Sequence, residues 1–443
     1  MAALAGSYSM PLIGVSIFIA ALTYTTYKLL SSYVHKWFQM KPIPGLEGTY
    51  PFIGNALQFE TNAGDFFKQI VEYTTEYSNA PLLKFWLGTL PFLVLFHAET
   101  VEHWAKVASA EKDADSHLPL LHPDGLLGGD ERADRDPGGE AKQDGREGMS
   151  DIISRRQRTP WFWFGFVYNY FGEGREHDKI LKILHSFTYN VIHERSENIQ
   201  YNESDSDSDQ GTKKRRAFLD MLLKATYEDG NKMTHQDIQE EVDTFMFEGH
   251  DTTAAAMNWV LHLLGSHPEA QSKVQQELQE VFGTSDRPVN TEDLKKLRYL
   301  DCVIKEALRL FPSVPFFGRN LGEDCHINGF KVPKGANAVV VTYALHRDPR
   351  YFPDPEEFRP ERFLPENSTG RPPYAYVPFS AGLRNCIGQR FAMMEEKVVL
   401  STILRNFNVE ACQTREELRP LGELILRPEK GIWIKLEKRL HKD

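Results

Sequence analysis

The first 40 residues are set apart by how few charged positions they contain. Residues 1–27 carry no Asp, Glu, Lys or Arg, and the stretch "PLIGVSIFIAALTYTTYKLL" is long enough to cross a bilayer as a helix. The first positive charges, Lys28, Lys36 and Lys41, come after residue 27, whereas a cleaved signal peptide carries basic residues before its apolar stretch. Because positive residues tend to stay on the cytosolic side, this order predicts that the body of the protein lies in the cytosol. The pattern predicts a membrane anchor and linker over residues 1–40. A buried helix is the alternative, because Gly, Thr and Tyr make the segment only moderately hydrophobic.

The body, residues 41–443, opens with alternating apolar positions. Residues 81–102, "PLLKFWLGTLPFLVLFHAETVE", predict two strands with Gly88 and Pro91 at the turn, then a short helix. Residues 105–148 contain no Phe, Tyr or Trp and no apolar periodicity, so they are predicted to be a disordered insert. Aromatic residues crowd positions 161–171. This segment either lines the core or dips into a membrane surface.

The middle of the chain has the periodicity of a long helix. Thr234 and Asp237 form a predicted capping pair, and Gly265 and Pro268 mark the end, a length of about 45 Å at 1.5 Å per residue. Its centre, "EGHDTT", places acidic and hydroxyl side chains beside Gly249, which weakens a helix. A buried helix interrupted in this way is typical of one that lines a site, and a solvated face is the alternative.

The last third combines helices with short strands. "PEAQSKVQQELQEVFG" and "DCVIKEALRLFP" predict helices, whereas "INGFKVPKG", "NAVVVTYAL", "ILRP" and "GIWIKL" predict strands. Many helices with a small late set of strands indicate a mainly α fold with a minor β part.

Charge and cysteine content narrow the chemistry. The net charge of −11 and the lack of a long basic run exclude nucleic acid as an expected partner. The 4 Cys show no paired spacing and no Cys-x-x-Cys, so disulfides and zinc are not expected. One of them, Cys386, lies in "PFSAGLRNCIGQR". A thiolate in a loop cleared by glycines indicates a ligand for a larger group.

Four motifs in a fixed order resemble one family. "FSAGLRNCIG" fits Phe-x-x-Gly-x-Arg-x-Cys-x-Gly, "EALR" fits Glu-x-x-Arg, "PERF" fits the segment that locks against it, and "EGHDTT" fits an oxygen-activating helix. The chain therefore resembles the cytochrome P-450 haem-thiolate monooxygenases. "FMFEGHDTTAAAMNW" and "YAYVPFSAGLRNCIGQRFA" are most similar to family 4, the fatty-acid ω-hydroxylases, and to its subfamily V.

The resemblance implies a haem (heme b) whose iron is bound by the thiolate of Cys386. Gly382 and Gly388 would let the backbone approach the sulfur, and Phe379 would pack beside it. The residues implied for the haem propionates are Arg319, Arg384 and Trp104.

On the other side of the haem, the resemblance gives Gly249 the role of making room for dioxygen. Asp251 and Thr252 would relay protons during its activation. Glu248 stands where members of family 4 can esterify a haem methyl, so the resemblance admits a covalent haem. A buried structural ion-pair network is implied for Glu306, Arg309 and Arg362.

The activity implied is hydroxylation of medium- or long-chain fatty acids at or near the ω carbon, with O2 as oxidant. Electrons would come from a membrane-bound NADPH-dependent reductase, and the protein would be a single-pass component of the endoplasmic reticulum membrane with a cytosolic catalytic domain. A haem-thiolate isomerase, which needs no reductase, is disfavoured by the pair Asp251 and Thr252.

The resemblance fails between about residue 103 and residue 148. The chain is several dozen residues short there, in the region of helices B′ to E, and the arginine that would pair with Trp104 is absent. Deleting one nucleotide after Trp104 in a suitable back-translation restores the family's text, so we hypothesise that residues 105–148 are frame-shifted coding sequence. The alternative function is then a catalytically inactive haem-binding or misfolded membrane product.

Overall fold

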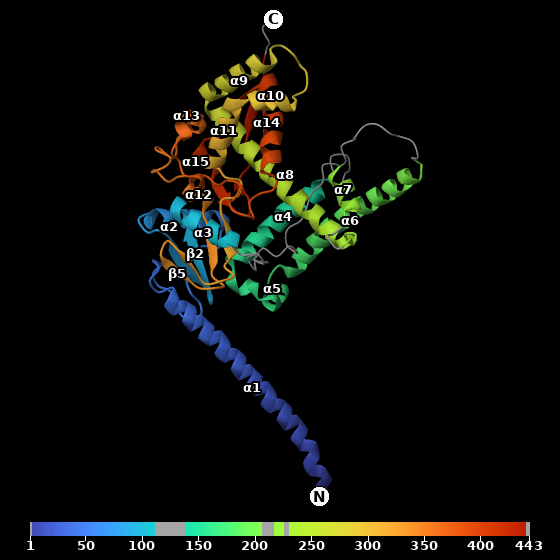
Figure 1. Cartoon of the computed structure of the whole chain (residues 1–443), viewed down its shortest axis with the longest axis vertical. Coiled ribbons are helices and arrows are strands. Elements are labelled where there is room, and N and C mark those ends of the chain that lie inside the picture. Colours follow the sequence, from blue (N-terminus) through green and yellow to red (C-terminus); the bar gives the residue numbers. More distant parts are fainter. Residues whose placement is uncertain (1, 111–138, 206–216, 226–229, 440–443) are drawn as a thin grey trace.

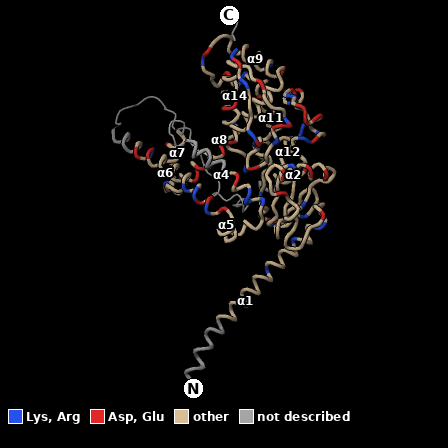
Figure 2. The backbone as a smooth tube through the Cα atoms, turned by 180° about the vertical axis from the view of Figure 1, so that it is seen from behind, with Lys and Arg blue, Asp and Glu red and all other residues tan. Residues whose placement is uncertain are grey.

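The computed structural model describes residues 2–110, 139–205, 217–225 and 230–439. Figure 1 shows one long helix, α1 (Ala2–Gln39), that projects from a body in which helices surround a small sheet. Charged residues are concentrated on the body and are sparse along the described part of α1 (Figure 2). The predicted mainly α fold with a minor β part is confirmed.

Helices make up most of the body. They are α2 (Ala63–Glu76), α3 (Ala98–Ala110), α4 (Gly139–Arg158), α5 (Gly165–Phe171), α6 (Gly174–Asp205), α7 (Phe218–Lys224), α8 (His235–Ser266), α9 (Pro268–Phe282), α10 (Thr291–Lys296), α11 (Arg298–Leu310), α12 (Thr342–Leu345), α13 (Pro365–Ser368), α14 (Gln389–Asn406) and α15 (Arg415–Leu418). Short 3-10 turns are η3 (Pro160–Trp163), η4 (Pro360–Phe363) and η5 (Pro373–Ala375).

The main sheet has the strand order β1-β2-β6-β3. β1 (Leu83–Leu87) and β2 (Leu90–Leu95) form an antiparallel hairpin, β2 runs parallel to β6 (Asn337–Val340), and β6 is antiparallel to β3 (Phe317–Asn320). Three two-stranded antiparallel pairs complete the strands: β4 (Cys325–Ile327) with β5 (Phe330–Val332), β7 (Phe407–Ala411) with β10 (Ile434–Lys438), and β8 (Pro420–Gly422) with β9 (Leu426–Pro428).

The largest core cluster joins α8, α9, α11 and α14. At its centre Trp259 of α8 stacks on Phe311 with ring centroids 4.0 Å apart, and its indole nitrogen donates to the carbonyl of Leu426. This packing fixes the second half of α8, which is buried on most sides. The polar centre of α8 lies outside this cluster, as the sequence pattern predicted.

The end of α1 is bound tightly to the sheet. Lys84 of β1 donates from Nζ to the carbonyls of Met40 and Lys41, at 2.6 and 3.1 Å, and pairs with Gly45 in an isolated parallel bridge. A Cβ at Gly45 would lie 2.6 Å from Cγ of Lys84, so only glycine fits this approach. Tyr33 of α1 stacks on Phe52 with centroids 5.0 Å apart.

The predicted helix near the amino terminus is confirmed, and it carries exposed apolar side chains such as Ile17, Phe18 and Leu29. Among the described residues, the search for a helix both long and apolar enough to cross a membrane finds none. The membrane crossing of residues 1–40 therefore stays a prediction.

The disordered insert predicted for residues 105–148 is wrong at both of its ends. α3 continues to Ala110, and Ala105 is buried against the sheet; α4 already begins at Gly139. The helix-forming Ala, Lys and Glu residues in these stretches explain the difference, because local helix propensity outweighs the lack of aromatic residues. Residues 111–138 lie outside the described residues.

The aromatic segment 161–171 forms η3 and α5. Phe164, Phe166, Tyr170 and Phe171 are exposed, whereas Tyr168 is buried against α4 and α6. Of the two interpretations left open by the sequence, exposure of most of the segment favours the surface-facing one.

Candidate functional site

The loop before α14 turns sharply to present Cys386. The amide of Cys386 donates to the carbonyl of Phe379 at 2.9 Å, and the amide of Asn385 donates to Gly382 at 3.3 Å. Gly382 has φ +83°, a left-handed conformation that glycine adopts without steric cost. A Cβ at Gly388 would lie 3.7 Å from the Cys386 sulfur, an ordinary contact, so crowding at the sulfur does not itself require glycine there.

The thiol of Cys386 is exposed, and its charge is set by nearby groups. Desolvation by the surrounding loop raises its pKa, and the carboxylate of Glu248 raises it further. The backbone N–H groups of Gly388 and Gln389 hydrogen-bond the sulfur and oppose this rise. Two amides directed at one sulfur favour a thiolate once a cation is bound to it.

The centre of α8 faces the same space as this thiol. Nothing lies within 4 Å of the position that a Cβ would occupy at Gly249, so the helix borders open space there. Desolvation raises the pKa of Glu248, and the guanidinium of Arg319 on β3 partly opposes the rise. Glu248 therefore lies within electrostatic range of both Cys386 and Arg319, so α8, β3 and the Cys386 loop lie near one another.

Asp251 and Thr252 are engaged by other partners. Asp251 forms an ion pair with Arg427 at 2.7 Å, and its other carboxylate oxygen lies 3.1 Å from Nδ1 of His250. The hydroxyl of Thr252 donates to the carbonyl of Glu248 at 2.6 Å, within α8. Asp251 and Arg427 also line a pocket of about 1580 Å³ that is partly open to solvent and has a mixed polar and apolar lining. The structure thus brings Asp251 and Thr252 together on α8 but directs the carboxylate toward β9.

Two of the three residues expected at the haem propionates contact β3, and the third, Arg319, belongs to that strand. Arg319 donates to the carbonyls of Gly318 and Arg384, and burial lowers its pKa, with the nearby charge of Arg384 acting in the same direction. Trp104 is only 1% exposed and packs against Phe317, with ring centroids 5.7 Å apart. Its indole N–H finds no acceptor in the described part of the chain.

These residues fit a haem. A buried N–H without an acceptor costs about 1–3 kcal/mol, and a propionate oxygen of a haem would remove that cost. The open space beside Gly249 supplies room for the haem, and the accessible thiol of Cys386 supplies a ligand for its iron. The neighbouring Arg319 and Arg384 supply positive charge for its propionates. Leu383, Ile387 and Phe391 flank the thiol, and Ile387 is 84% exposed, so apolar cover for a porphyrin is present as well.

Glu306 and Arg309 form a buried pair on α11. The guanidinium of Arg309 binds both carboxylate oxygens of Glu306, at 2.7 and 2.8 Å, and Arg362 of η4 approaches the same carboxylate at 3.4 Å. Both members of the pair are fully buried. Arg309 also donates to the carbonyls of His346 and Pro355, so nearly all its N–H groups are satisfied. The structure brings together the three residues that the sequence grouped.

A largely apolar cavity of about 1160 Å³, part of it open to solvent, adjoins this site. We call it the apolar cavity. Its walls come from the faces of β1 and β2, from α2, from the end of α4 and from β3, and Arg319 is one of its lining residues. The residues that line it are Phe66, Ile70, Phe85, Leu87, Phe92, Val94, Ser154, Gln157, Arg158, Val314, Phe316, Phe317, Gly318, Arg319, Val339, Val341, Gly422, Glu423 and Leu424.

The sequence did not identify two charged residues of these cavities. Arg158 ends α4 and lines the apolar cavity, and Arg427 of β9 pairs with Asp251. For Arg158, its place at the end of a helix followed by aromatic residues is only a weak sequence signal of a functional role. The motif "ILRP" gives no such signal for Arg427, because its partner Asp251 is 176 residues away in the sequence.

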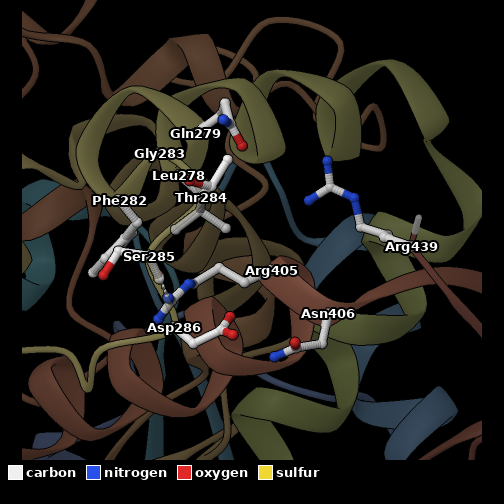
Figure 3. A pocket seen from close by; sticks show the side chains of 10 residues that line it. All are labelled: Leu278, Gln279, Phe282, Gly283, Thr284, Ser285, Asp286, Arg405, Asn406 and Arg439. Atoms are coloured by element: carbon white, nitrogen blue, oxygen red, sulfur yellow. Dashed lines mark hydrogen bonds between the residues drawn. The ribbon is translucent and has the colours of Figure 1, made fainter. Parts of the chain in front are cut away.

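A polar pocket at the other end of α14 is separate from this site. Figure 3 shows that Arg405 and Arg439 approach it from different elements, beside Asp286 and the end of α9. Arg405 donates to the carbonyls of Ser285 and Arg287, and Arg439 donates to that of Leu404. Both arginines therefore serve to join chain segments.

Comparison with known proteins finds relatives that match most of this chain. A family model described as Cytochrome P450 matches residues 141–436. The chain is 48% identical to Cytochrome P450 4V2 of Rattus norvegicus, with 97% of this chain and 96% of that protein covered. It is 47% identical to Cytochrome P450 4V2 of Homo sapiens, with 95% and 94% covered. Cytochrome P450 4c3 of Drosophila melanogaster is 49% identical over 66% of this chain and 56% of that protein.

The alignment to the rat protein also carries a length difference. It extends over 504 positions, more than the 443 residues of this chain, so the chain lacks residues that the relative has. The prediction that the chain is several dozen residues short agrees with this difference.

Proposed function

Since the chain belongs to the cytochrome P450 family of monooxygenases, within its family 4, we propose that it hydroxylates medium- or long-chain fatty acids at or near the ω carbon. Dioxygen is the oxidant, and a membrane-bound NADPH-dependent reductase supplies the electrons. One observation carries this proposal: Arg319 lines the apolar cavity and also donates to the carbonyl of Arg384 in the Cys386 loop, so a long hydrocarbon chain held in that cavity can reach toward this loop.

Cys386 would hold the haem iron through its sulfur, with the amides of Gly388 and Gln389 stabilising the thiolate. A haem bound there would supply the activation of dioxygen. Trp104 and Arg319 would bind its propionates through the indole N–H and the guanidinium, and the nearby Arg384 would add positive charge.

The protons reach the site along α8. Thr252 holds one at Oγ, at present donated to the carbonyl of Glu248, and Asp251 is the neighbouring acid. The ion pair of Asp251 with Arg427 has to open for this transfer, because the carboxylate is directed toward β9. A hydroxyl and an acid on adjacent residues form a relay that general acid catalysis requires.

Glu248 is proposed to form an ester with a methyl group of a bound haem: a C–O bond to the carboxylate would replace one C–H bond, and the dioxygen of the proposed reaction would accept the proton and the two electrons released. Desolvation raises the pKa of this carboxyl, which lies within electrostatic range of the Cys386 thiol. Acidic organic extraction followed by mass spectrometry tests this step: the haem mass stays on the protein if the ester forms and leaves with the solvent in Glu248→Ala.

Membrane attachment is proposed through α1 and the aromatic segment η3–α5. Exposed apolar side chains on α1 and the exposed Phe164, Phe166 and Phe171 support this placement. With the lysines after the apolar stretch on the cytosolic side, the protein is a single-pass component of the endoplasmic reticulum membrane with a cytosolic body.

The first experiment is a reduced carbon-monoxide difference spectrum of the full chain. A red-shifted Soret band, absent in Cys386→Ser, is expected for a thiolate-bound haem. NADPH- and reductase-dependent formation of ω-hydroxy fatty acids by the same preparation is then expected. A Soret band without any hydroxylated product would contradict the proposed reaction.

A catalytically inactive product is the second candidate, and one observation favours it. The alignment to the rat protein extends over 504 positions against the 443 residues of this chain, so part of the relative's length has no counterpart here. Sequencing the transcript across residues 103–148 and repeating the spectrum with the restored frame separates the two: a band only in the restored chain supports the inactive product.

A further inference from the structure

The apolar cavity has a polar wall that the proposed reaction does not use. Ser154, Gln157 and Arg158, from the last two turns of α4, line it together with Glu423. The rest of the lining is mostly aliphatic and aromatic, so polar side chains gathered on one helix stand out. Such a combination suits an amphipathic ligand with one polar end.

Ser154 lacks a partner. It is only 2% exposed, and its hydroxyl has no hydrogen-bond partner among the residues that the structure describes. A buried hydroxyl in this state carries a desolvation cost, which a ligand oxygen in the cavity would remove.

Arg158 has unused donors. Its Nε donates to the carbonyl of Thr61 at 3.3 Å, and in the described ranges no acceptor is within hydrogen-bond distance of its Nη1 and Nη2 groups. Desolvation lowers its pKa, which marks a guanidinium largely removed from bulk water. A planar fork with free N–H groups matches the two oxygens of a carboxylate.

The two arginines of the apolar cavity belong to different surroundings. Arg319 lies at the thiol site, with Glu248 and Arg384, whereas Arg158 on α4 faces Glu423 and Asp151. A ligand held at Arg158 by its polar end can therefore extend its hydrocarbon chain along the apolar wall toward the side that carries Arg319.

We propose that Arg158, with the hydroxyl of Ser154 and the amide of Gln157, binds the carboxylate of the fatty-acid substrate in the apolar cavity. This inference rests on the proposed function and names its specificity-determining residues. The bound carboxylate fixes one end of the substrate at α4, so the opposite end is the one presented toward the thiol site, which accounts for oxidation at or near the ω carbon.

Glu423 opposes this interaction. It lines the same cavity, and its carboxylate lies within electrostatic range of Asp151, Arg158 and Arg427. Desolvation raises the pKa of Glu423, and the charge of Asp151 raises it further, so its negative charge is reduced in the folded protein. Removing this charge should strengthen the binding of a fatty acid.

The test measures the binding of lauric acid, lauryl alcohol and methyl laurate to the full chain in nanodiscs by equilibrium dialysis. The wild type should bind the acid about tenfold or more tightly than the alcohol or ester, as expected for charge-assisted hydrogen bonds. Arg158→Gln should lower the affinity for the acid to that for the alcohol and leave the alcohol unchanged. Glu423→Gln should tighten binding of the acid only.

Arg155→Gln is the matched control. Arg155 lies one turn earlier on α4, is exposed, pairs with Asp151 and Glu173, and does not line the cavity. It should leave all three affinities unchanged. Three results would each overturn the inference. The wild type could bind the acid and the alcohol equally, or not bind the acid. Arg155→Gln and Arg158→Gln could also lose the same affinity for the acid.

Binding and turnover separate this inference from the proposed function. Arg158-dependent binding of lauric acid without any hydroxylated product would refute the function and leave the binding site. Hydroxylation of lauric acid with the same KM in the wild type and in Arg158→Gln would refute the site and leave the function. Circular dichroism of each variant verifies that it is folded.

Discussion

The carboxyl of Glu396 on α14 is buried without full hydrogen bonding. Desolvation raises its pKa to about 8, with the neighbouring charge of Glu395 adding to the shift, and one of its oxygens lacks a partner among the described residues. Because the folded protein holds this proton more tightly than the unfolded chain, the carboxyl's contribution to stability is complete below about pH 4.5 and is lost as the pH rises to about 8.

We expect Glu396→Gln to remove this dependence. The variant should match the wild type near pH 5 and exceed it at higher pH, by about 1.4 kcal/mol for each pH unit up to about pH 8. The difference in Tm between the two proteins, followed from pH 5 to pH 9 by intrinsic fluorescence, measures it. Glu410→Gln, at an exposed pair with Lys435, is the control and should show no such trend. A constant difference across this range would show that Glu396 is not buried as described.

The pair of Glu306 and Arg309 supports a second prediction at this scale. Glu306→Ala leaves a buried guanidinium without its counter-charge, so the variant should lose about 3–5 kcal/mol of unfolding free energy. Glu72→Gln, which removes a surface pair with Lys68, should cost less than about 1 kcal/mol. Urea unfolding of both variants measures the contrast, and similar losses would contradict the assignment.

Residue partnerships were predictable only where sequence spacing or a motif carried them. Glu306 and Arg309 stand three apart on one helix, and the loop around Cys386 is defined by its own glycines. The partners of Asp251 and Arg158 come from segments distant in the sequence, and their pairing depends on how β9 and the loop before α2 pack. Tertiary packing of this kind leaves no local pattern.

At the scale of elements, α8 depends on its first turn. Thr234 accepts from the amide of Asp237, and Asp237 reaches back to the amide of Thr234 at 2.7 Å, a complete capping box. We expect Thr234→Ala to destabilise the protein by about 1 kcal/mol.

Thr244→Ala on the same helix is the matched control. Its hydroxyl only donates to the carbonyl of Glu240, and alanine has the higher helix propensity, so little change or a slight gain is expected. Thermal unfolding of both variants compares them. Equal losses would show that the capping box does not stabilise α8.

The long helices were predictable because their apolar period repeats many times. α8, α9 and α11 appear where the sequence placed them, and so does the hairpin of β1 and β2. β3, β7 and β8 were missed, since each is a short strand whose pairing with a distant partner, not its own pattern, makes it a strand. The prediction of disorder was wrong at the ends of residues 105–148, because it rested on composition and did not take the helix propensity of these residues into account.

At the scale of the whole molecule, the described residues leave one face of α14 uncovered. Phe391, Met394 and Val398 lie on adjacent turns and are all exposed, and Phe391 reaches 67%. Apolar side chains three or four residues apart form a continuous stripe, which in a complete globular domain is covered.

We expect the triple variant Phe391→Ser, Met394→Ser and Val398→Ser to bind less of the dye anilinonaphthalene sulfonate than the wild type. Its Tm should change little, because exposed side chains contribute little packing energy. A clear loss of Tm, equivalent to about 2–5 kcal/mol of unfolding free energy, would instead show that these side chains are packed. Ser-scanning of the buried Leu400 and Leu404 on the opposite face serves as the positive control for such a loss.

The attachment of α1 to the sheet has a mechanical consequence. Lys84 binds the carbonyls of Met40 and Lys41 directly after α1, a side chain at Gly45 would clash with Lys84, and Tyr33 stacks on Phe52. A helix attached in this way is rigidly connected to the body and does not act as a flexible linker. A surface that binds the projecting part of α1 therefore also determines the orientation of the body relative to that surface. It sets the distance and the direction from which substrate reaches the apolar cavity.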